Sequence, residues 1–162
     1  MRPDHHSTFM EIAHVLARRS TCSRRAVGCV LVNDHNHIIG TGYNGSPVGA
    51  PHCIANPCSG ARSGHGSGLD LCDAIHAEQN ALLQCRDVQE IATIYTTSFP
   101  CAHCFKMIAN TSCCEIYFAE EYPSARGTVL ALNQQLTTPM EFYHFAAGPV
   151  PQASRVGATP RS

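Results

Sequence analysis

The sequence predicts an α/β domain in which short strands alternate with helices. Two apolar runs rich in β-branched residues, 27–32 and 38–43, are joined by a polar turn at 33–36 and indicate an antiparallel hairpin. Two further strand-like runs, 91–97 and 114–119, flank a segment with helical spacing, which is the β-α-β alternation of an α/β fold. With 162 residues, 44% of them hydrophobic, the chain is long enough for one domain with a full core.

The remaining elements follow from the same patterns. Residues 9–20 carry apolar side chains at the spacing of one buried helical face and predict the first helix. A further helix is predicted over 124–136 and a last strand over 140–145. From residue 148 onward the sequence is small, polar and broken by prolines, which predicts a mobile tail. We therefore expect one domain over residues 1–147 and a flexible tail over residues 148–162.

The composition excludes several classes of protein. Eleven Lys and Arg against twelve Asp and Glu give a net charge of -1, which argues against a nucleic-acid backbone as the main partner. No apolar run approaches the length of a membrane span, and the first residues lack the apolar core of a signal peptide. Ten cysteines without a signal peptide favour reduced thiols and metal ligands over disulfides. We expect a cytosolic protein that binds neither nucleic acid nor membrane.

Two short motifs, His76-Ala77-Glu78 and Pro100-Cys101-Ala102-His103-Cys104, each stand where a helix is predicted to begin. Both continue at helical spacing, and a proline favours the first helical turn. The two cysteines of C-x-x-C lie about one turn apart and can bind one ion, to which His76 adds a third, neutral ligand. The fourth tetrahedral position stays open, as in a catalytic zinc site, where bound water can reach a pKa of roughly 7.

Glu78 is the predicted general acid and base of this site. It lies only two residues from His76, so we expect it beside the metal rather than on it, where it can take up a proton and return it elsewhere. H-x-E…P-C-x-x-C is a described signature of zinc nucleobase deaminases. The alternatives are a closed structural zinc and a redox dithiol. Neither needs a glutamate two residues after a histidine, nor a proline before the first cysteine.

The segment 44–70 is glycine-rich and irregular, and it is longer than a compact domain normally tolerates without a staple. A second, closed zinc would supply one, since little apolar surface is available to hold this segment. The residues for such a site are Cys22, Cys53, Cys58 and Cys72, with His65 as an alternative ligand. Unligated thiols are the other interpretation.

The densest positive patch brackets Cys22 and consists of Arg18, Arg19, Arg24 and Arg25. It is either a solvated helix end, which a helix C-terminus favours, or a phosphate clamp, because a guanidinium presents a fork of donors to phosphate oxygens. The turn at 42–47, with sequence GYNGSP, follows the second predicted strand. Its glycines would allow close approach of a ligand and Asn44 offers both a donor and an acceptor. The alternative is a simple turn.

Residues 8–136 resemble the deoxycytidylate (dCMP) deaminase family within the cytidine deaminase-like superfamily. Four motifs carry the resemblance in order: Thr21-Cys22-Ser23-Arg24 leading into Val27-Gly28, Gly42-Tyr43-Asn44-Gly45-Ser46-Pro47, His76-Ala77-Glu78-Gln79-Asn80-Ala81, and Pro100-Cys101-Ala102-His103-Cys104. The last two are shared by the superfamily, whereas the first two point to its nucleotide-specific branch. The resemblance implies a three-layer α/β/α sandwich on a five-stranded mixed sheet, and a hexamer in members under allosteric control.

The implied reaction is the hydrolysis of dCMP to dUMP and ammonia, which supplies the precursor of thymidylate. By resemblance, Asn44 holds the sugar, Arg24 contacts the phosphate, and the small Ala77 lets the pyrimidine lie close to zinc. Glu78 takes a proton from the zinc-activated water, protonates N3 and helps the amine to leave. Some family members hold a second zinc near the positions of Cys22 and Cys53. The insert at 60–68 leaves the other ligands open among Cys58, His65 and Cys72.

The resemblance also implies control by nucleoside triphosphates. In this family dCTP with Mg²⁺ activates and dTTP inhibits, at a site near subunit contacts that includes Gly42, Tyr43, Asn44 and Gly45. Two other substrate classes remain open. One is another free cytosine nucleoside or nucleotide; the other is cytosine or adenine in a nucleic acid, against which the balanced charge and the absence of Trp argue.

Overall fold

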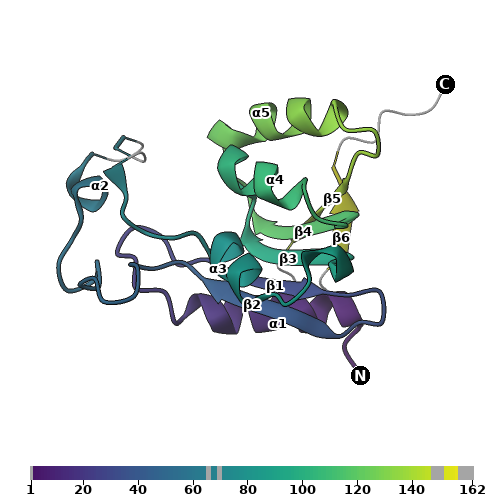
Figure 1. Cartoon of the computed structure of the whole chain (residues 1–162), viewed down its shortest axis with the longest axis horizontal. Coiled ribbons are helices and arrows are strands. Elements are labelled where there is room, and N and C mark those ends of the chain that lie inside the picture. The colour runs from purple at the N-terminus through teal and green to yellow at the C-terminus, as the bar shows by residue number, and fades with distance from the viewer. Residues whose placement is uncertain (1, 65–66, 69–70, 147–151, 157–162) are drawn as a thin grey trace.

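A computed structural model describes residues 2–64, 67–68, 71–146 and 152–156 of the chain (Figure 1). Its elements in chain order are α1 (His5–Ala17), β1 (Gly28–Val32), β2 (Ile38–Tyr43), α2 (Ser59–Arg62), α3 (Ala77–Gln84), the 3₁₀ helix η2 (Val88–Glu90), β3 (Thr93–Ser98), α4 (Ala102–Ile108), β4 (Glu115–Glu120), α5 (Pro123–Gln134), β5 (Glu141–Ala146) and β6 (Gln152–Arg155). The strands form one mixed sheet in the order β2-β1-β3-β4-β5-β6.

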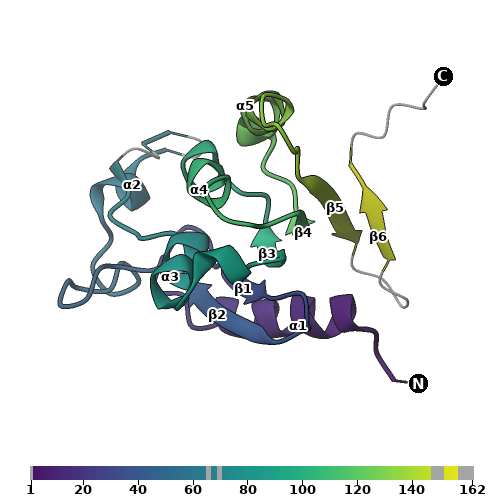
Figure 2. The ribbon, with the colours of Figure 1, turned by 45° about the vertical axis from the view of Figure 1, so that its right-hand side comes forward.

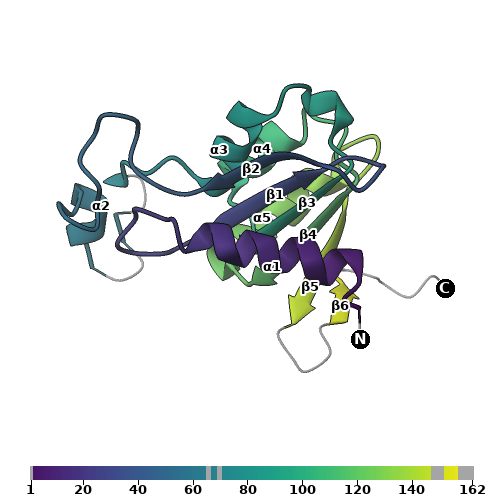
Figure 3. The same cartoon turned by 90° about the horizontal axis from the view of Figure 1, so that it is seen from below.

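The sheet is the middle of three layers, as predicted. Helix α1 crosses one face, whereas α3, α4 and α5 lie on the other (Figure 3). Strand β1 is antiparallel to both β2 and β3, and β3, β4 and β5 run parallel to one another. Parallel neighbours need crossover connections, which α4 and α5 provide. The predicted β-α-β alternation is thereby confirmed.

The strand count differs from the prediction of five. Residues 152–155, inside the predicted tail, form a sixth strand that pairs antiparallel with β5 (Figure 2). The cause is backbone pairing: without β6, strand β5 would be an edge with a row of unpaired N–H and C=O groups, and an extended neighbour satisfies them whatever its side chains. The boundary between domain and tail at residues 147 and 148 lies outside the described residues and stays a prediction.

The helices are short and their ends follow local capping chemistry. Helix α1 begins at His5 rather than residue 9, because the Asp4 carboxylate caps it by accepting a hydrogen bond from the Ser7 N–H at 2.7 Å. Helix α5 begins at Pro123, a residue suited to the first helical position. Within the described ranges, no helix combines the length and apolarity needed to cross a bilayer. The cytosolic location stays a prediction.

Strand β1 is an interior strand of the sheet, between β2 and β3, and all five of its residues are buried. Its side chains alternate between two apolar cores. Cys29 and Leu31 belong to the core under α3, α4 and α5, and Val30 and Val32 to the core under α1. Burial on both faces explains why this run lacks polar residues.

Gly42 brings β2 directly onto the backbone of α3. A Cβ atom at this position would lie 2.2 Å from the Ala77 carbonyl oxygen and 2.5 Å from the Ala81 nitrogen. Only glycine permits this approach, because both neighbours are backbone atoms of the helix. The contact fixes the first turn of α3, which carries the functional motif His76-Ala77-Glu78.

Candidate metal centre and active site

The two predicted motifs lie at helix N-termini that converge on one place. His76 is the N-cap residue of α3 and Cys101 is the N-cap residue of α4, in whose first turn Cys104 lies. Gln79 anchors the first cap, because its side-chain oxygen accepts a hydrogen bond from the His76 N–H at 2.9 Å. Sequence analysis missed Gln79, although a Gln three residues after an N-cap is a known capping signal.

The three predicted ligand atoms fit a zinc ion. His76 Nδ1 lies 3.5 Å from Cys101 Sγ and 3.3 Å from Cys104 Sγ, and all three ligand atoms lie within 4.8 Å of one another. With Zn–S of about 2.3 Å and Zn–N of about 2.0 Å, tetrahedral angles require S···N separations of about 3.5 Å. One imidazole and two thiols therefore form a donor set that zinc prefers, with a fourth position left for a non-protein ligand.

The three ligand side chains shift one another's pKa values through hydrogen bonds and burial. The pKa of Cys101 is lowered to about 3, first because the Cys104 thiol donates a hydrogen bond to it and also because His76 lies beside it. The same hydrogen bond, together with burial, raises the pKa of Cys104. The hydrogen bond with Cys101 also raises the pKa of His76. Opposite pKa shifts in neighbouring side chains are typical of a functional site.

Glu78 points into the interior beside this trio. Glu78 is 4% exposed, and burial raises the pKa of its carboxyl group above the ordinary value. The Thr96 hydroxyl, on the neighbouring strand β3, lies 3.5 Å from Glu78 Oε1. A buried carboxyl group with a raised pKa holds a proton more readily than an exposed one, which suits a group that must accept and return a proton in general acid and base catalysis.

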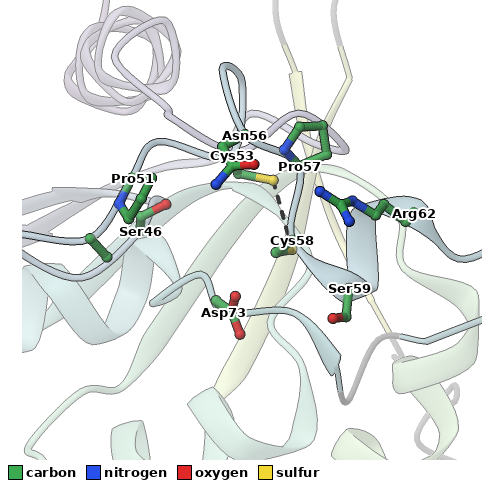
Figure 4. Close-up of a pocket in the computed structure, with 10 residues that line it drawn as sticks. Ser46, Pro51, Cys53, Asn56, Pro57, Cys58, Ser59, Arg62 and Asp73 are labelled. Atoms are coloured by element: carbon green, nitrogen blue, oxygen red, sulfur yellow. Dashed lines mark hydrogen bonds between the residues drawn. The ribbon is translucent and has the colours of Figure 1, made fainter.

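A second cysteine cluster lies in the excursion between β2 and α3. Cys53 Sγ lies 3.7 Å from Cys58 Sγ, close to the roughly 3.8 Å that two thiolates on one tetrahedral zinc require. The two sulfurs face each other in a pocket of about 250 Å³ between Arg62 and Asp73 (Figure 4). The pKa of the Cys53 thiol is lowered to about 7, mainly by its hydrogen bond with the Ser23 hydroxyl.

The predicted second zinc site is only partly assembled. Burial raises the pKa of Cys72, and the nearby thiols of Cys22 and Cys58 add to the effect. Yet among the described residues only the His76 group brings three ligand atoms within 4.8 Å. His65 lies outside the described residues. The second zinc therefore stays a prediction.

The predicted substrate contacts are engaged within the protein. Arg24 Nη1 donates to the carbonyl oxygens of Gly60 and Ser67 at 2.6 and 2.9 Å, so this guanidinium fastens the segment around α2. Ala77 is fully buried at the start of α3, next to the ligand trio. Neither observation tests a contact with a nucleotide, so the roles of Arg24 with phosphate and of Ala77 with the pyrimidine stay predictions.

Asn44 is 8% exposed and ties three segments together. Its Oδ1 accepts hydrogen bonds from the Ser20 hydroxyl at 2.7 Å and the Val27 N–H at 2.8 Å. Its Nδ2 donates to the Arg25 carbonyl oxygen at 2.7 Å. Most of its hydrogen-bonding capacity thus holds the chain that leads into β1, and its predicted contact with the sugar stays a prediction.

The residues that follow β2 also hold the start of α3 in place through hydrogen bonds. Gly45 and Ile75 exchange two backbone hydrogen bonds of 3.0 and 2.8 Å, immediately before His76. The Tyr43 carbonyl oxygen accepts a hydrogen bond from Asn80 Nδ2 at 2.8 Å. Packing alone explains the glycine at position 45, where a Cβ atom would lie 2.4 Å from Thr21 Oγ1. An effector role of this turn stays a prediction.

Fold and site together define an α/β/α protein with a zinc centre of the catalytic kind, in which a buried glutamate stands beside an incomplete set of protein ligands. Residues 3–120 match the family described as the cytidine and deoxycytidylate deaminase zinc-binding region. The chain belongs to this family.

Individual relatives agree with this assignment. The chain is 40% identical over 124 residues to the deoxycytidylate deaminase of Saccharomyces cerevisiae, covering 75% of this chain but 39% of the yeast protein. It is 42% identical over 127 residues to the deoxycytidylate deaminase of Mycobacterium phage D29, covering 74% of this chain and 98% of the phage protein. The chain thus spans less than half the length of the yeast relative.

A solved structure has the same fold. The dCMP deaminase of the cyanophage S-TIM5 in complex with dCMP and dUMP superposes with a TM-score of 0.61 at 26% sequence identity, covering 88% of this chain and 98% of the cyanophage chain.

Proposed function

We propose that the protein catalyses the hydrolytic deamination of dCMP to dUMP and ammonia. The observation that carries this proposal is the convergence of His76, Cys101 and Cys104 beside the buried Glu78. The relatives named deoxycytidylate deaminase, and the cyanophage enzyme in complex with dCMP and dUMP, support dCMP as the substrate. A different free cytosine nucleoside or nucleotide is the second candidate substrate.

The residues of the chain divide the reaction between them. Zinc held by His76, Cys101 and Cys104 would act as a Lewis acid that lowers the pKa of water. Glu78 accepts the proton of the attacking water, transfers it to N3 of the pyrimidine and then assists the departure of ammonia from C4. The raised pKa of Glu78 suits this task, because the same carboxyl group must hold the proton between the two transfers.

The test is a deamination assay with purified, zinc-loaded protein on cytidine, deoxycytidine, CMP, dCMP and dCTP, followed by the change in ultraviolet absorbance. We expect the highest kcat/KM for dCMP. A higher kcat/KM for another member of the panel would reassign the substrate, and absence of turnover on all five would contradict the proposal.

A second zinc in the excursion between β2 and α3 is part of the proposal. The 3.7 Å separation of the Cys53 and Cys58 sulfurs supports it, since this spacing suits two thiolates on one ion. Cys72, whose thiol lies near those of Cys58 and Cys22, and Cys22 itself are the proposed further ligands, with His65 as the alternative. Such a site would staple a segment that has little apolar core of its own.

Regulation and assembly complete the proposal. The segment Gly42, Tyr43, Asn44 and Gly45 is joined to the start of α3 by the backbone bridge from Gly45 to Ile75, so a nucleotide bound there would bias the position of His76. We expect a sigmoidal dependence on dCMP in a homo-oligomer, a hexamer by family resemblance, which dCTP with Mg²⁺ makes hyperbolic and dTTP depresses. Initial rates with each triphosphate, together with light scattering, test this. Hyperbolic rates that neither triphosphate changes would contradict it.

A further inference from the structure

Thr96 is a polar residue in a row of apolar side chains. Strand β3 pairs with β1 and β4, and Thr96 lies opposite Cys29 on one side and Phe118 on the other. Cys29 and Phe118 belong to the apolar core under α3, α4 and α5, and Thr96 itself is 0% exposed. A buried hydroxyl costs stability unless it is hydrogen-bonded, and valine has the same shape without that cost. Packing alone therefore does not explain the hydroxyl of Thr96.

The Thr96 hydroxyl lies next to two parts of the candidate active site. Its Oγ1 donates to the Ser98 carbonyl oxygen at 3.1 Å and lies 3.5 Å from Glu78 Oε1. Ser98 is the last residue of β3 and precedes the ligand Cys101 by three residues. Glu78 lies in the first turn of α3, which His76 caps. One buried hydroxyl is thus within hydrogen-bonding distance of both the proton shuttle and the segment that leads to a metal ligand.

The carboxyl group of Glu78 must keep one orientation to act on both the attacking water and the substrate. The side chains of His76, Cys101 and Cys104 act on its charge, which places them close to it. A glutamate side chain has several rotatable bonds, and a displacement of about 1 Å at a reacting group can lower a rate by about 100-fold. Thr96 restricts this freedom from strand β3, because a β-branched side chain is itself confined to few rotamers.

The contact between Thr96 and Glu78 leaves the second carboxylate oxygen for the chemistry. A hydroxyl hydrogen rotates to suit its acceptors, so the hydrogen of Thr96 can turn from the Ser98 carbonyl toward Glu78 Oε1. At 3.5 Å this contact is long, and catalytic hydrogen bonds often shorten only when the substrate is bound. An oxygen that accepts a hydrogen bond binds a proton less readily, which directs the transferred proton to Oε2.

The neighbouring Thr97 is buried as well, but its hydroxyl has a different partner. Thr97 is 3% exposed, and its Oγ1 accepts a hydrogen bond from the Gly28 N–H at 3.1 Å, at the start of β1. Successive residues of a strand point to opposite faces, so Thr97 shares the face of Tyr95, which belongs to the core under α1. Two adjacent buried threonines thus differ in whether the hydroxyl lies next to the carboxyl group of Glu78.

We propose that Thr96 is a positioning residue whose buried hydroxyl holds the Glu78 carboxylate in its working orientation. This inference rests on the proposed deamination of a cytosine nucleotide. During the reaction the hydroxyl donates to Glu78 Oε1, while Oε2 takes the proton of the attacking water and passes it to N3 of the pyrimidine. Thr96 acts through Glu78 and not on the substrate, so it contributes to the rate of the chemical step rather than to the binding of dCMP.

The test compares Thr96→Val with the matched variant Thr97→Val, both loaded with zinc and assayed on dCMP. Each change removes one buried hydroxyl and keeps the shape of the side chain. Loss of a hydrogen bond to a carboxylate lowers a rate roughly tenfold or more, so kcat of Thr96→Val should fall by about that factor with KM within about twofold of wild type. Thr97→Val should keep its kcat, and Thr96→Ser should recover most of it. Equal losses of kcat in the two valine variants, or no recovery in Thr96→Ser, would overturn the proposal.

A double-mutant cycle separates a role through Glu78 from a general loss of packing. In protein that already carries Glu78→Ala, Thr96→Val should leave the residual kcat unchanged within about twofold, because the group that Thr96 positions is gone. A further loss as large as in the wild-type background, or loss of zinc from Thr96→Val in elemental analysis, would make Thr96 a structural residue and overturn the proposal. If the wild-type protein deaminates no cytosine compound, the proposed function and this inference fail together; if it deaminates dCMP and Thr96→Val keeps the wild-type kcat, only this inference fails.

Discussion

Gly42→Ala tests whether the close contact between β2 and α3 serves packing at the active site. The added Cβ atom would meet the Ala77 carbonyl oxygen at 2.2 Å, whereas real Cβ contacts essentially never fall below 3.0 Å. Both obstacles are backbone atoms of α3, so strand and helix must part by about 1 Å, and shifts of this kind in a packed core cost about 1–3 kcal/mol. We expect the free energy of unfolding to fall by that amount.

The same shift should reach the chemistry, because Ala77 lies between His76 and Glu78. We expect kcat to fall at least tenfold in Gly42→Ala, since displacements of about 1 Å at reacting groups cost up to 100-fold. The assay is urea unfolding of the zinc-loaded protein together with initial rates on dCMP. Gly127→Ala is the matched control: Gly127 lies within α5, nothing lies within 4 Å of its added Cβ atom, and the change should stabilise the protein by about 0.5–1 kcal/mol. A Gly42→Ala protein as stable and active as wild type would refute the packing argument.

Three other predictions follow from the geometry. Glu78→Ala should keep its zinc, measured by elemental analysis, but its kcat should fall more than about 100-fold. Cys104→Ser should instead lose zinc from the active site. Near-normal turnover in Glu78→Ala would disprove the proton shuttle. Wild-type protein should hold two zinc ions per chain and Cys53→Ser one; one ion in both proteins, with equal stability, would return Cys53 to an unligated thiol. The hydrogen bond with Ser7 lowers the pKa of Asp4 from 3.8, so wild type should be more stable than Asp4→Ala by about 0.5–2 kcal/mol at pH 7. That advantage should be fully present above pH 3.8 and vanish as the pH falls through the lowered pKa; a pH-independent difference in urea unfolding would contradict it.

The residues of the candidate site could be picked out from the sequence because each of its two motifs is local, with His76 two residues from Glu78 and Cys101 three residues from Cys104. C-x-x-C at a helix start sets two sulfurs by local geometry alone, and the structure adds only the meeting of α3 with α4. The two neighbouring arginines show the limit of such reasoning. Residue type and spacing offered a phosphate clamp at Arg24 as one of two interpretations, but they could not show that the Arg24 guanidinium donates to a carbonyl group near α2 while that of Arg25 pairs with Glu120.

Features that depend on backbone pairing or long loops were harder to predict. Strand β6 has no apolar alternation, since residues 152–155 read QASR and pair through main-chain groups. The internal hydrogen bonds of the buried Asn44 amide were not predicted, because a side chain with both a donor and an acceptor can bond the backbone or a ligand and the sequence does not separate the two. The second cysteine cluster depends on the path of an irregular segment, and such a path cannot be predicted from the spacing of apolar residues.

The most direct measurement of the central claim is the fate of dCMP with the zinc-loaded protein in ¹⁸O-labelled water. Hydrolysis at C4 predicts one dUMP that carries one ¹⁸O atom and one ammonia per turnover, with the signal lost in Glu78→Ala. Protein that holds zinc at His76, Cys101 and Cys104 yet forms no labelled dUMP would contradict the assignment of this site as a dCMP deaminase.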